Sequence, residues 1–354
     1  MGLNGLVPVA FAAIVNKEPS KAFVENRRTT SAQCYSDGTA KSVQKLSYLY
    51  GSVSAFYTLE SGDTFGMSVA SLGDLNGDGV GDLAVAAHSD DDGGAITGSV
   101  YVLFLETDAT VRNAQKLSML YGNLDSFCIL DAGDRFGVAI VALGDVNDDG
   151  VVDLAVGAHL DDDGGSDAGA AYVLFLETDG TAKFAQKLSA LYGNFNTFYT
   201  LDSSDDFGRS VAGPGDLDGD GVVDMAVGAV SDADGGSGAG AVYLLFLKTD
   251  GTCKSAQKLS NHYGNFNMFY ALDASDNFGV SVASLGDVNE DSVVDLAVSA
   301  YDDDDGGTDT GAVYILFLET DGTIKGAQKV SNLYGSFNAY YTLTAARVFY
   351  LDLG

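Results

Sequence analysis

The chain alternates short apolar segments with polar segments rich in Gly and Asp. Residues 207–212 alternate apolar and polar positions, as a half-buried strand does. Residues 224–229 form a run of small apolar residues, which is typical of a strand buried on both faces. Residues 241–247 are rich in β-forming residues and lead into a Thr-Asp-Gly turn, after which 255–260 return as a fourth strand. The pattern predicts four antiparallel strands and no sustained helix.

This four-strand pattern repeats every 71 residues, as the Gln residues at 44, 115, 186, 257 and 328 and the Phe-Gly pairs at 65, 136, 207 and 278 show. Four strands per unit is the anatomy of a propeller blade, which needs neighbours to bury its faces. A β-solenoid is the alternative, but its coils usually repeat at shorter periods. The sequence therefore predicts an all-β fold, a β-propeller of four-stranded antiparallel blades.

The repeat also suggests how the chain is divided. Residues 1–43 match the unit poorly, 44–343 hold four repeats and the start of a fifth, and 344–354 form a degenerate tail. The terminal pieces would give about five blades if the ring closes with both ends sharing one blade. A fragment of a longer propeller is equally compatible with the pattern.

A nine-residue acidic loop separates the first and second strands of every unit. Calcium takes several oxygen ligands, and side chains at positions 1, 3, 5 and 9 with the carbonyl of position 7 can surround one ion. Position 6 must turn sharply and is Gly in three copies but Ser292 in the fourth, which predicts that the fourth site is the weakest. The expected ligands are Asp74, Asn76, Asp78, Val80 and Asp82; Asp145, Asn147, Asp149, Val151 and Asp153; Asp216, Asp218, Asp220, Val222 and Asp224; and Asp287, Asn289, Asp291, Val293 and Asp295. The loop is not an EF-hand, because position 12 is Val within a β-segment and no helices flank it.

The charge balance agrees with a cation-binding protein. The chain has 50 Asp and Glu against 18 Lys and Arg, a formal net charge of −32, which argues against a nucleic-acid partner. Three Cys residues at non-equivalent places in the repeat form neither a disulfide framework nor a zinc motif. Residues 6–15 are apolar but too short to span a membrane and weak as a secretion signal, and no later segment is long enough to span one.

At the Phe-Gly pairs and acidic loops the sequence resembles the FG-GAP repeat family, the blades of the integrin alpha-subunit headpiece. The "GAP" element is matched by Ala86-Ala-His88 and its equivalents, with the proline always replaced. The resemblance implies a β-propeller with calcium in inter-strand hairpins, usually extracellular or at the cell surface, acting in adhesion or ligand recognition. Family propellers commonly have seven blades, more than this chain supplies, and nothing in the sequence resembles the rest of an integrin.

In a meandering blade, successive loops emerge at alternate ends. The calcium loops therefore share one face with the Thr-Asp-Gly turns, while the other face collects a second acidic loop and an aromatic inter-blade link. We favour solvation of these acidic loops over a second cation site, and packing of the aromatic residues over ligand contact. The sharper hypothesis makes this second face the site of a protein or glycan ligand. Its candidate residues are Tyr121, Tyr192, Phe195, Tyr199, Tyr263, Asp161, Asp163, Asp232 and Asp234.

No catalytic set of residues stands out from the repeat. His88 and His159 occupy positions that hold Val230 and Tyr301 in the sister units, so packing is expected of them rather than proton transfer. We therefore expect a calcium-binding recognition or adhesion module that is not an enzyme. The alternatives are a calcium-dependent carbohydrate-active enzyme and a purely structural surface or matrix module.

Overall fold

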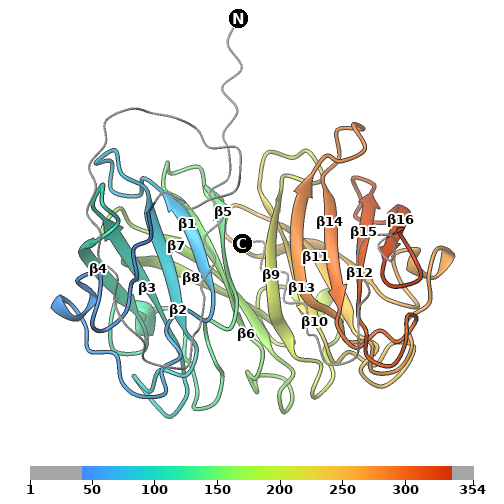
Figure 1. The fold of residues 1–354 in the computed structure, drawn as a ribbon, viewed down its shortest axis with the longest axis horizontal. Helices are drawn as coiled ribbons and strands as arrows, with labels where there is room; N and C mark the ends of the chain where they lie inside the picture. Colours follow the sequence, from blue (N-terminus) through green and yellow to red (C-terminus); the bar gives the residue numbers. More distant parts are fainter. Residues whose placement is uncertain (1–41, 337–354) are drawn as a thin grey trace, which may run out of the picture.

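The computed structural model describes residues 42–336, which fold into four separate four-stranded sheets with consecutive strand order (Figure 1). Blade one contains β1 (Val69–Gly73), β2 (Asp82–Ala87), β3 (Ser99–Leu105) and β4 (Val111–Leu117). Blade two contains β5 (Ile140–Gly144), β6 (Asp153–Ala158), β7 (Ala170–Leu176) and β8 (Ala182–Ser189). Blade three contains β9 (Phe207–Gly215), β10 (Asp224–Ala229), β11 (Ala241–Leu247) and β12 (Cys253–Leu259). Blade four contains β13 (Phe278–Gly286), β14 (Asp295–Ala300), β15 (Ala312–Leu318) and β16 (Ile324–Val330).

The expected strands are confirmed in number, order and antiparallel pairing. In the third unit the two middle strands have the predicted bounds, while β9 runs on to Gly215 and β12 begins at Cys253, two residues before the prediction. The register repeats from blade to blade, since Val100 pairs with Leu117 as Val242 pairs with Leu259. The helical segments within the described residues are four three-residue 3-10 turns in the links, η1 (Val53–Ala55), η2 (Leu124–Ser126), η3 (Phe195–Thr197) and η4 (Phe266–Met268).

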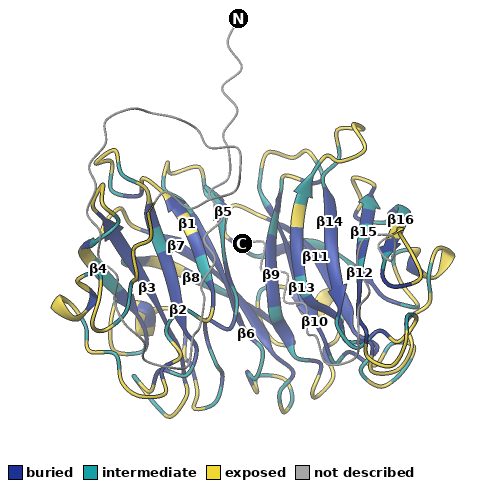
Figure 2. Ribbon diagram, viewed as in Figure 1, coloured by how far each residue is buried: buried dark blue, intermediate teal, exposed yellow. Residues whose placement is uncertain are grey.

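Hydrophobic packing lies mainly between the blades. The first strands of successive blades lie against one another, and three of the four core clusters combine side chains from two neighbouring blades. The third strands β3, β7 and β11 are buried along their whole length (Figure 2). A single blade would expose its two apolar faces to solvent, so each blade depends on its neighbours for stability.

Backbone hydrogen bonds also tie each blade to the next. The amide of Phe136, which leads into blade two, donates to the carbonyl of Thr97 in blade one at 2.9 Å. The first residue of β8, Ala182, donates to Gly122 in the preceding link, also at 2.9 Å. Equivalent bonds recur at Phe207 and Cys253, so the blades keep one fixed relation to each other.

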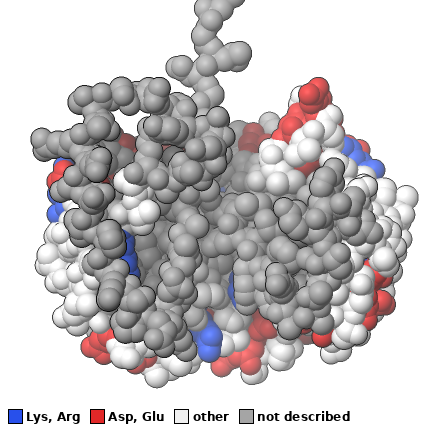
Figure 3. Space-filling view, viewed as in Figure 1, with Lys and Arg blue, Asp and Glu red and all other residues white. Residues whose placement is uncertain are grey.

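The expectations about closure of the ring and about a blade shared by the two ends fall on residues 1–41 and 337–354, outside the described part of the chain. Between residues 42 and 336, no helix is long and apolar enough to cross a membrane. Figure 3 shows Asp and Glu side chains gathered along the lower rim of the face in view.

Candidate calcium loops and the opposite acidic face

Each acidic loop is held in shape by its own first carboxylate. In the second loop, Asp145 accepts hydrogen bonds from the amide of Asp149 at 3.0 Å and from the amide of Gly150 at 2.7 Å. The same two bonds occur in the other three loops. The loop therefore curls around its position-1 side chain, which gathers oxygen atoms on one side.

The carboxylate at position 9 anchors the loop to the blade. Asp153 is fully buried, and it accepts one hydrogen bond from Val146 in the loop and one from Leu176 at the end of β7. Burial raises the pKa of Asp153 to about 7, against the lowering effect of these backbone bonds. Asp224 has the same surroundings, and burial raises its pKa to about 7 as well. Buried carboxylates of this kind are usually paired with a cation or bound to a metal.

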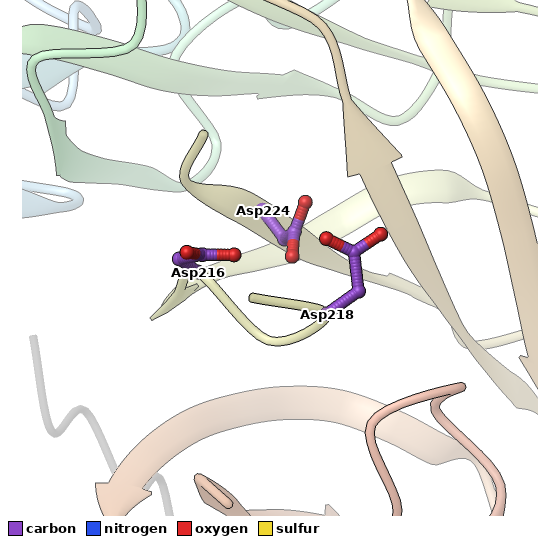
Figure 4. Close-up of side chains that lie close together, drawn as sticks. All are labelled: Asp216, Asp218 and Asp224. Carbon is purple, nitrogen blue, oxygen red and sulfur yellow. The ribbon is translucent and has the colours of Figure 1, made fainter. Parts of the chain in front are cut away.

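The third loop brings together the largest number of carboxylates. Asp216, Asp218 and Asp224 each offer an oxygen atom, and these atoms lie within 4.8 Å of one another (Figure 4). The Oδ1 atom of Asp218 is buried and has no hydrogen-bond partner. A calcium ion fits this donor set, because it prefers hard oxygen ligands and would satisfy the unpartnered atom.

The fourth loop keeps its shape despite Ser292. This serine has φ of +71°, close to the values of +84° and +92° at Gly150 and Gly221, and its amide donates to Asp287 at 2.8 Å as the glycine amides do to their own position-1 residues. A side-chain-bearing residue in this left-handed conformation costs about 1 kcal/mol or more. The prediction that this site is the weakest remains a prediction, now with a conformational reason.

A basic residue from the fourth strand reaches each loop, which sequence reasoning missed. The ammonium of Lys183 lies 2.7 Å from Asp149, and that of Lys254 lies 2.6 Å from Asp218 and also contacts Asp220. Arg112 and Lys325 make the corresponding contacts in the first and fourth loops. Because these residues directly follow the turn between the third and fourth strands, the contacts confirm that this turn and the acidic loop share one end of the blade.

The second acidic loop, at the opposite end, is not simply solvated as expected. Asp161 is almost completely buried, accepts the hydroxyl of Tyr172 at 3.0 Å, and lies 2.6 Å from the ammonium of Lys187. Asp90, Asp232 and Asp303 have the same Tyr and Lys partners in their own blades. The solvated interpretation is therefore wrong for one Asp of each cluster, whose charge a buried lysine already balances. The 71-residue recurrence of these Lys residues was the available signal.

Four of the candidate ligand residues surround one cavity of about 190 Å³ in blade three. Its lining residues are Tyr199, Thr200, Asp202, Asp205, Asp232, Ala233, Asp234, Lys258 and Tyr263. Lys258 lies 5.5 Å from the centre of the Tyr263 ring and ion-pairs with Asp232 and Asp234. The hydroxyl of Tyr199 accepts a hydrogen bond from the amide of Lys258, which fixes one wall.

The remaining candidate ligand residues lie at positions of other blades that are equivalent to those lining this cavity, with one exception. Tyr121 and Tyr192 are exposed and cover Lys116 and Lys187, while Asp161 and Asp163 pair with Lys187. Phe195 is fully buried and contacts the rings of Phe207 and Tyr243. Its assignment to a ligand surface is wrong, because this residue belongs to the core between blades two and three.

A second buried carboxylate lies near each Lys–Asp pair and was not identified from the sequence. Asp205 accepts a hydrogen bond from the amide of Asp202 at 2.8 Å, and burial raises its pKa to about 7, helped by the negative charge of Asp232. Asp134 and Asp276 have raised pKa values of about 7 for the same reason. Burial therefore favours the protonated form of these three carboxyl groups.

Comparison with known proteins agrees with the repeat and the blades. The FG-GAP repeat family model matches residues 65–103 and 278–316. The chain is 31% identical to integrin alpha-3 of Cricetulus griseus over 206 residues, 40% identical to human integrin alpha-10 over 134, and 34% identical to human integrin alpha-6 over 173.

These matches cover 58%, 38% and 48% of this chain but only 17%, 10% and 13% of the three relatives. The chain thus corresponds to a small part of each relative. The chain contains FG-GAP repeats, is similar over part of its length to integrin alpha chains, and folds as blades of a β-propeller.

Proposed function

We propose that this protein is a calcium-binding β-propeller that recognises a protein or glycan ligand outside the cell and has no catalytic activity of its own. The observation that carries the calcium assignment is the cluster of Asp216, Asp218 and Asp224, with its unpartnered buried oxygen. The similarity to integrin alpha chains supports a role in adhesion or ligand recognition and an extracellular or cell-surface location.

Calcium has a structural role in this proposal. The loop joins the first and second strands, and its position-9 residue also bonds to the third strand, so a bound ion would hold three strands in register. We expect four sites of unequal affinity. The third has four Asp side chains where the others have three Asp and one Asn, and affinity rises with the charge of the ligand set.

The calcium assignment is tested by calorimetric melting and by calcium titration of the full chain. Saturating calcium should raise the melting temperature relative to chelator, because a ligand that binds only the folded state stabilises it. Asp218→Asn should weaken the tightest site, whereas Glu177→Gln, an exposed carboxylate at the same end of blade two, should leave it unchanged. Equal melting temperatures in calcium and in chelator would refute the structural role of the ion.

Ligand recognition is assigned to the face opposite the calcium loops, where the cavity of blade three and the exposed tyrosines lie. Tyr combines an apolar ring with a polar tip and suits both protein and sugar surfaces. A screen against glycans and candidate protein partners, with and without calcium, tests this assignment.

Binding that is lost in Tyr263→Ser but kept in Tyr48→Ser would support the assignment. Tyr48 serves as the control because it is also exposed, lies in the link before blade one and does not line this cavity. Turnover of a polysaccharide in the same screen would favour the carbohydrate-active alternative, and absence of any ligand would favour a purely structural module.

A further inference from the structure

Two arginines and two histidines occupy positions that hold other residue types in sister repeats. All four lie at the end of the blades where the first strands begin and the second strands end. Arg135 precedes blade two and Arg209 lies on β9, while His88 and His159 follow β2 and β6. In the sister units, the position of Arg135 is Thr, Asp or Asn, and that of Arg209 is Met or Val. The internal symmetry of the fold therefore does not require these two cations.

The backbone places each arginine beside one histidine at a junction between blades. Gly137 packs against Ala86 so closely that a Cβ on this glycine would lie 3.1 Å from the Ala86 methyl group. At the next junction, a Cβ on Gly157 would lie only 2.0 Å from the carbonyl oxygen of Gly208, so the two backbones are in direct contact. Arg135 and His88 flank the first contact, and Arg209 and His159 flank the second.

Electrostatics agrees with this proximity. Burial lowers the pKa of His88 to about 4 and that of His159 to about 3, and the positive charges of Arg135 and Arg209 lower both further. Both imidazoles are therefore neutral at pH 7 and can donate one hydrogen bond each. Asp206, the acidic residue just before β9, is turned to the hydroxyl of Ser231, which donates to it at 2.6 Å.

Blade two is the one described blade in which the polar groups at this place lack partners. Thr64 bonds to His88 at 2.7 Å in blade one, Asp206 to Ser231 in blade three, and Asn277 to Asp302 at 2.8 Å in blade four. In blade two, the corresponding residues are Arg135, His159 and Leu160. The Leu160 side chain has no polar atom, and the Nδ1 atom of His159 has no hydrogen-bond partner.

The unpartnered groups in and beside blade two are all suited to an anion. The Nδ1 atom of His159 is buried without a hydrogen-bond partner. Among residues 42–336, neither Arg135 nor Arg209 forms an ion pair or a side-chain hydrogen bond, in a chain whose formal charge is −32. Burial raises the pKa of Asp206 and the charge of Arg209 acts to lower it, but the hydrogen bond of that carboxylate is with Ser231. Guanidinium groups that no described carboxylate holds, in so acidic a protein, point to a function in binding.

We propose that Arg135, Arg209 and His159 form a binding site for a single carboxylate group of the recognised ligand. The planar guanidinium group matches a carboxylate in a bidentate arrangement, and the neutral imidazole can donate a further hydrogen bond. The strongly negative field of the whole chain disfavours a multiply charged anion, so one carboxylate in a neutral or basic setting fits best. The site lies on the same end of the blades as the tyrosines of the proposed recognition face, and this inference deepens that proposed function and rests on it.

The site is tested by NMR titration of the calcium-saturated full chain at fixed ionic strength. The probe is N-acetyl-aspartic acid methylamide, and the matched uncharged compound is N-acetyl-asparagine methylamide. The acid should shift the ring signals of His159 and the Nε–H signals of both arginines in a saturable way, and the amide should not. Identical responses to the two compounds, or no response to either, would overturn the proposal.

Variants identify the residues. Arg135→Gln and Arg209→Gln should each weaken binding of the acid about tenfold or more, since a hydrogen bond to a charged group is lost. Lys248→Gln removes the same charge from an exposed position at the calcium-loop end and should change binding less than about twofold. An equal loss in Lys248→Gln would show a general charge effect and reject the site.

Two further results separate this inference from the proposed function. If a variant does not fold, the titration of the unmodified chain still decides the matter, because it compares acid and amide directly. If the acid fails to bind while calcium still stabilises the chain and a whole ligand still binds, the carboxylate site alone is rejected.

Discussion

The ammonium of Lys258 lies 2.6 Å from the Oδ2 atom of Asp232, and both side chains are almost completely buried. The two residues come from β12 and from the loop after β10, so the pair closes one end of the blade across β11 between them. The hydroxyl of Tyr243 on β11 donates to the same carboxylate at 3.0 Å. Every described blade repeats this three-residue arrangement, which makes the second acidic loop part of the framework.

Replacing Lys258 by Met should destabilise the protein strongly, because Asp232 would be left as an unpaired buried charge. Breaking a buried ion pair in this way costs about 3–5 kcal/mol. Lys254→Met, four residues earlier on the same strand but partly exposed, should cost less than about 1 kcal/mol. Urea unfolding in saturating calcium measures both, and equal losses would contradict the structural role of the Lys258 pair.

Stability should depend on pH through Asp205. Its pKa is raised from 3.8 to about 7 in the folded protein, mainly by burial and then by Asp232, with Lys258 and the Asp202 amide opposing. The folded state therefore binds this proton more tightly than the unfolded state, so this group's contribution to stability is full below about pH 4 and is lost as pH rises to about 7. Asp205→Asn should remove up to one proton from the slope of unfolding free energy against pH in that window.

Denaturant unfolding at a series of pH values, in saturating calcium, checks this prediction. Asp202→Asn is the matched control, because Asp202 lies in the same loop and is exposed. A slope that is the same in Asp205→Asn and in the unmodified chain would show that the carboxylate is not protonated in the folded state.

Ser292→Gly should strengthen the fourth calcium site. Glycine adopts the φ of +71° without the cost of a β-carbon, a gain of about 1 kcal/mol and hence roughly fivefold in affinity. Gly150→Ser should weaken the second site by a similar factor, since no atom lies within 4 Å of a Cβ placed there and only the conformation is changed. Calcium titration calorimetry reads both, and parallel changes in the two variants would contradict the conformational explanation.

Lys254→Gln should raise calcium affinity at the third site. The ammonium contacts Asp218 and Asp220, both expected ligands, and it opposes a divalent cation by repulsion. Because Lys254 is partly exposed, the effect should be modest, about 1 kcal/mol or less. Lys248→Gln on the same blade should show a smaller gain, and an unchanged or lower affinity in Lys254→Gln would argue against the predicted ligand set.

Phe195 and Tyr192 should respond in opposite ways. Phe195→Ala should cost about 3–5 kcal/mol of stability, because a fully buried ring between two blades is lost. Tyr192→Ser should change stability little, since 48% of its surface is exposed, and any effect should fall on ligand binding. Thermal melting together with the ligand screen distinguishes the two, and a stable Phe195→Ala variant would contradict the assignment of this ring to the core.

Features that depend on residues close together in the chain could be predicted from the sequence alone. Strand periodicity, the turn after Leu247 and the curl of the acidic loop around Asp216 are all local, so the unit of four strands follows from the order of residues alone. The 71-residue repeat then implies the blade architecture, because one unit cannot bury its own faces.

Features that depend on residues distant in the chain follow only from the packing of the blades. Lys187 approaches Asp161 from 26 residues away and Tyr172 from 11, and their contact turned an apparently solvated acidic loop into a buried one. Phe195 has the sequence setting of a link residue, but β9 and β11 close over it. Arg209 lies beside His159 only because neighbouring blades pack at Gly157 and Gly208. The type of a side chain indicates which roles it can have. Its burial and the charges around it depend on the packed neighbours, and these decide which role it has.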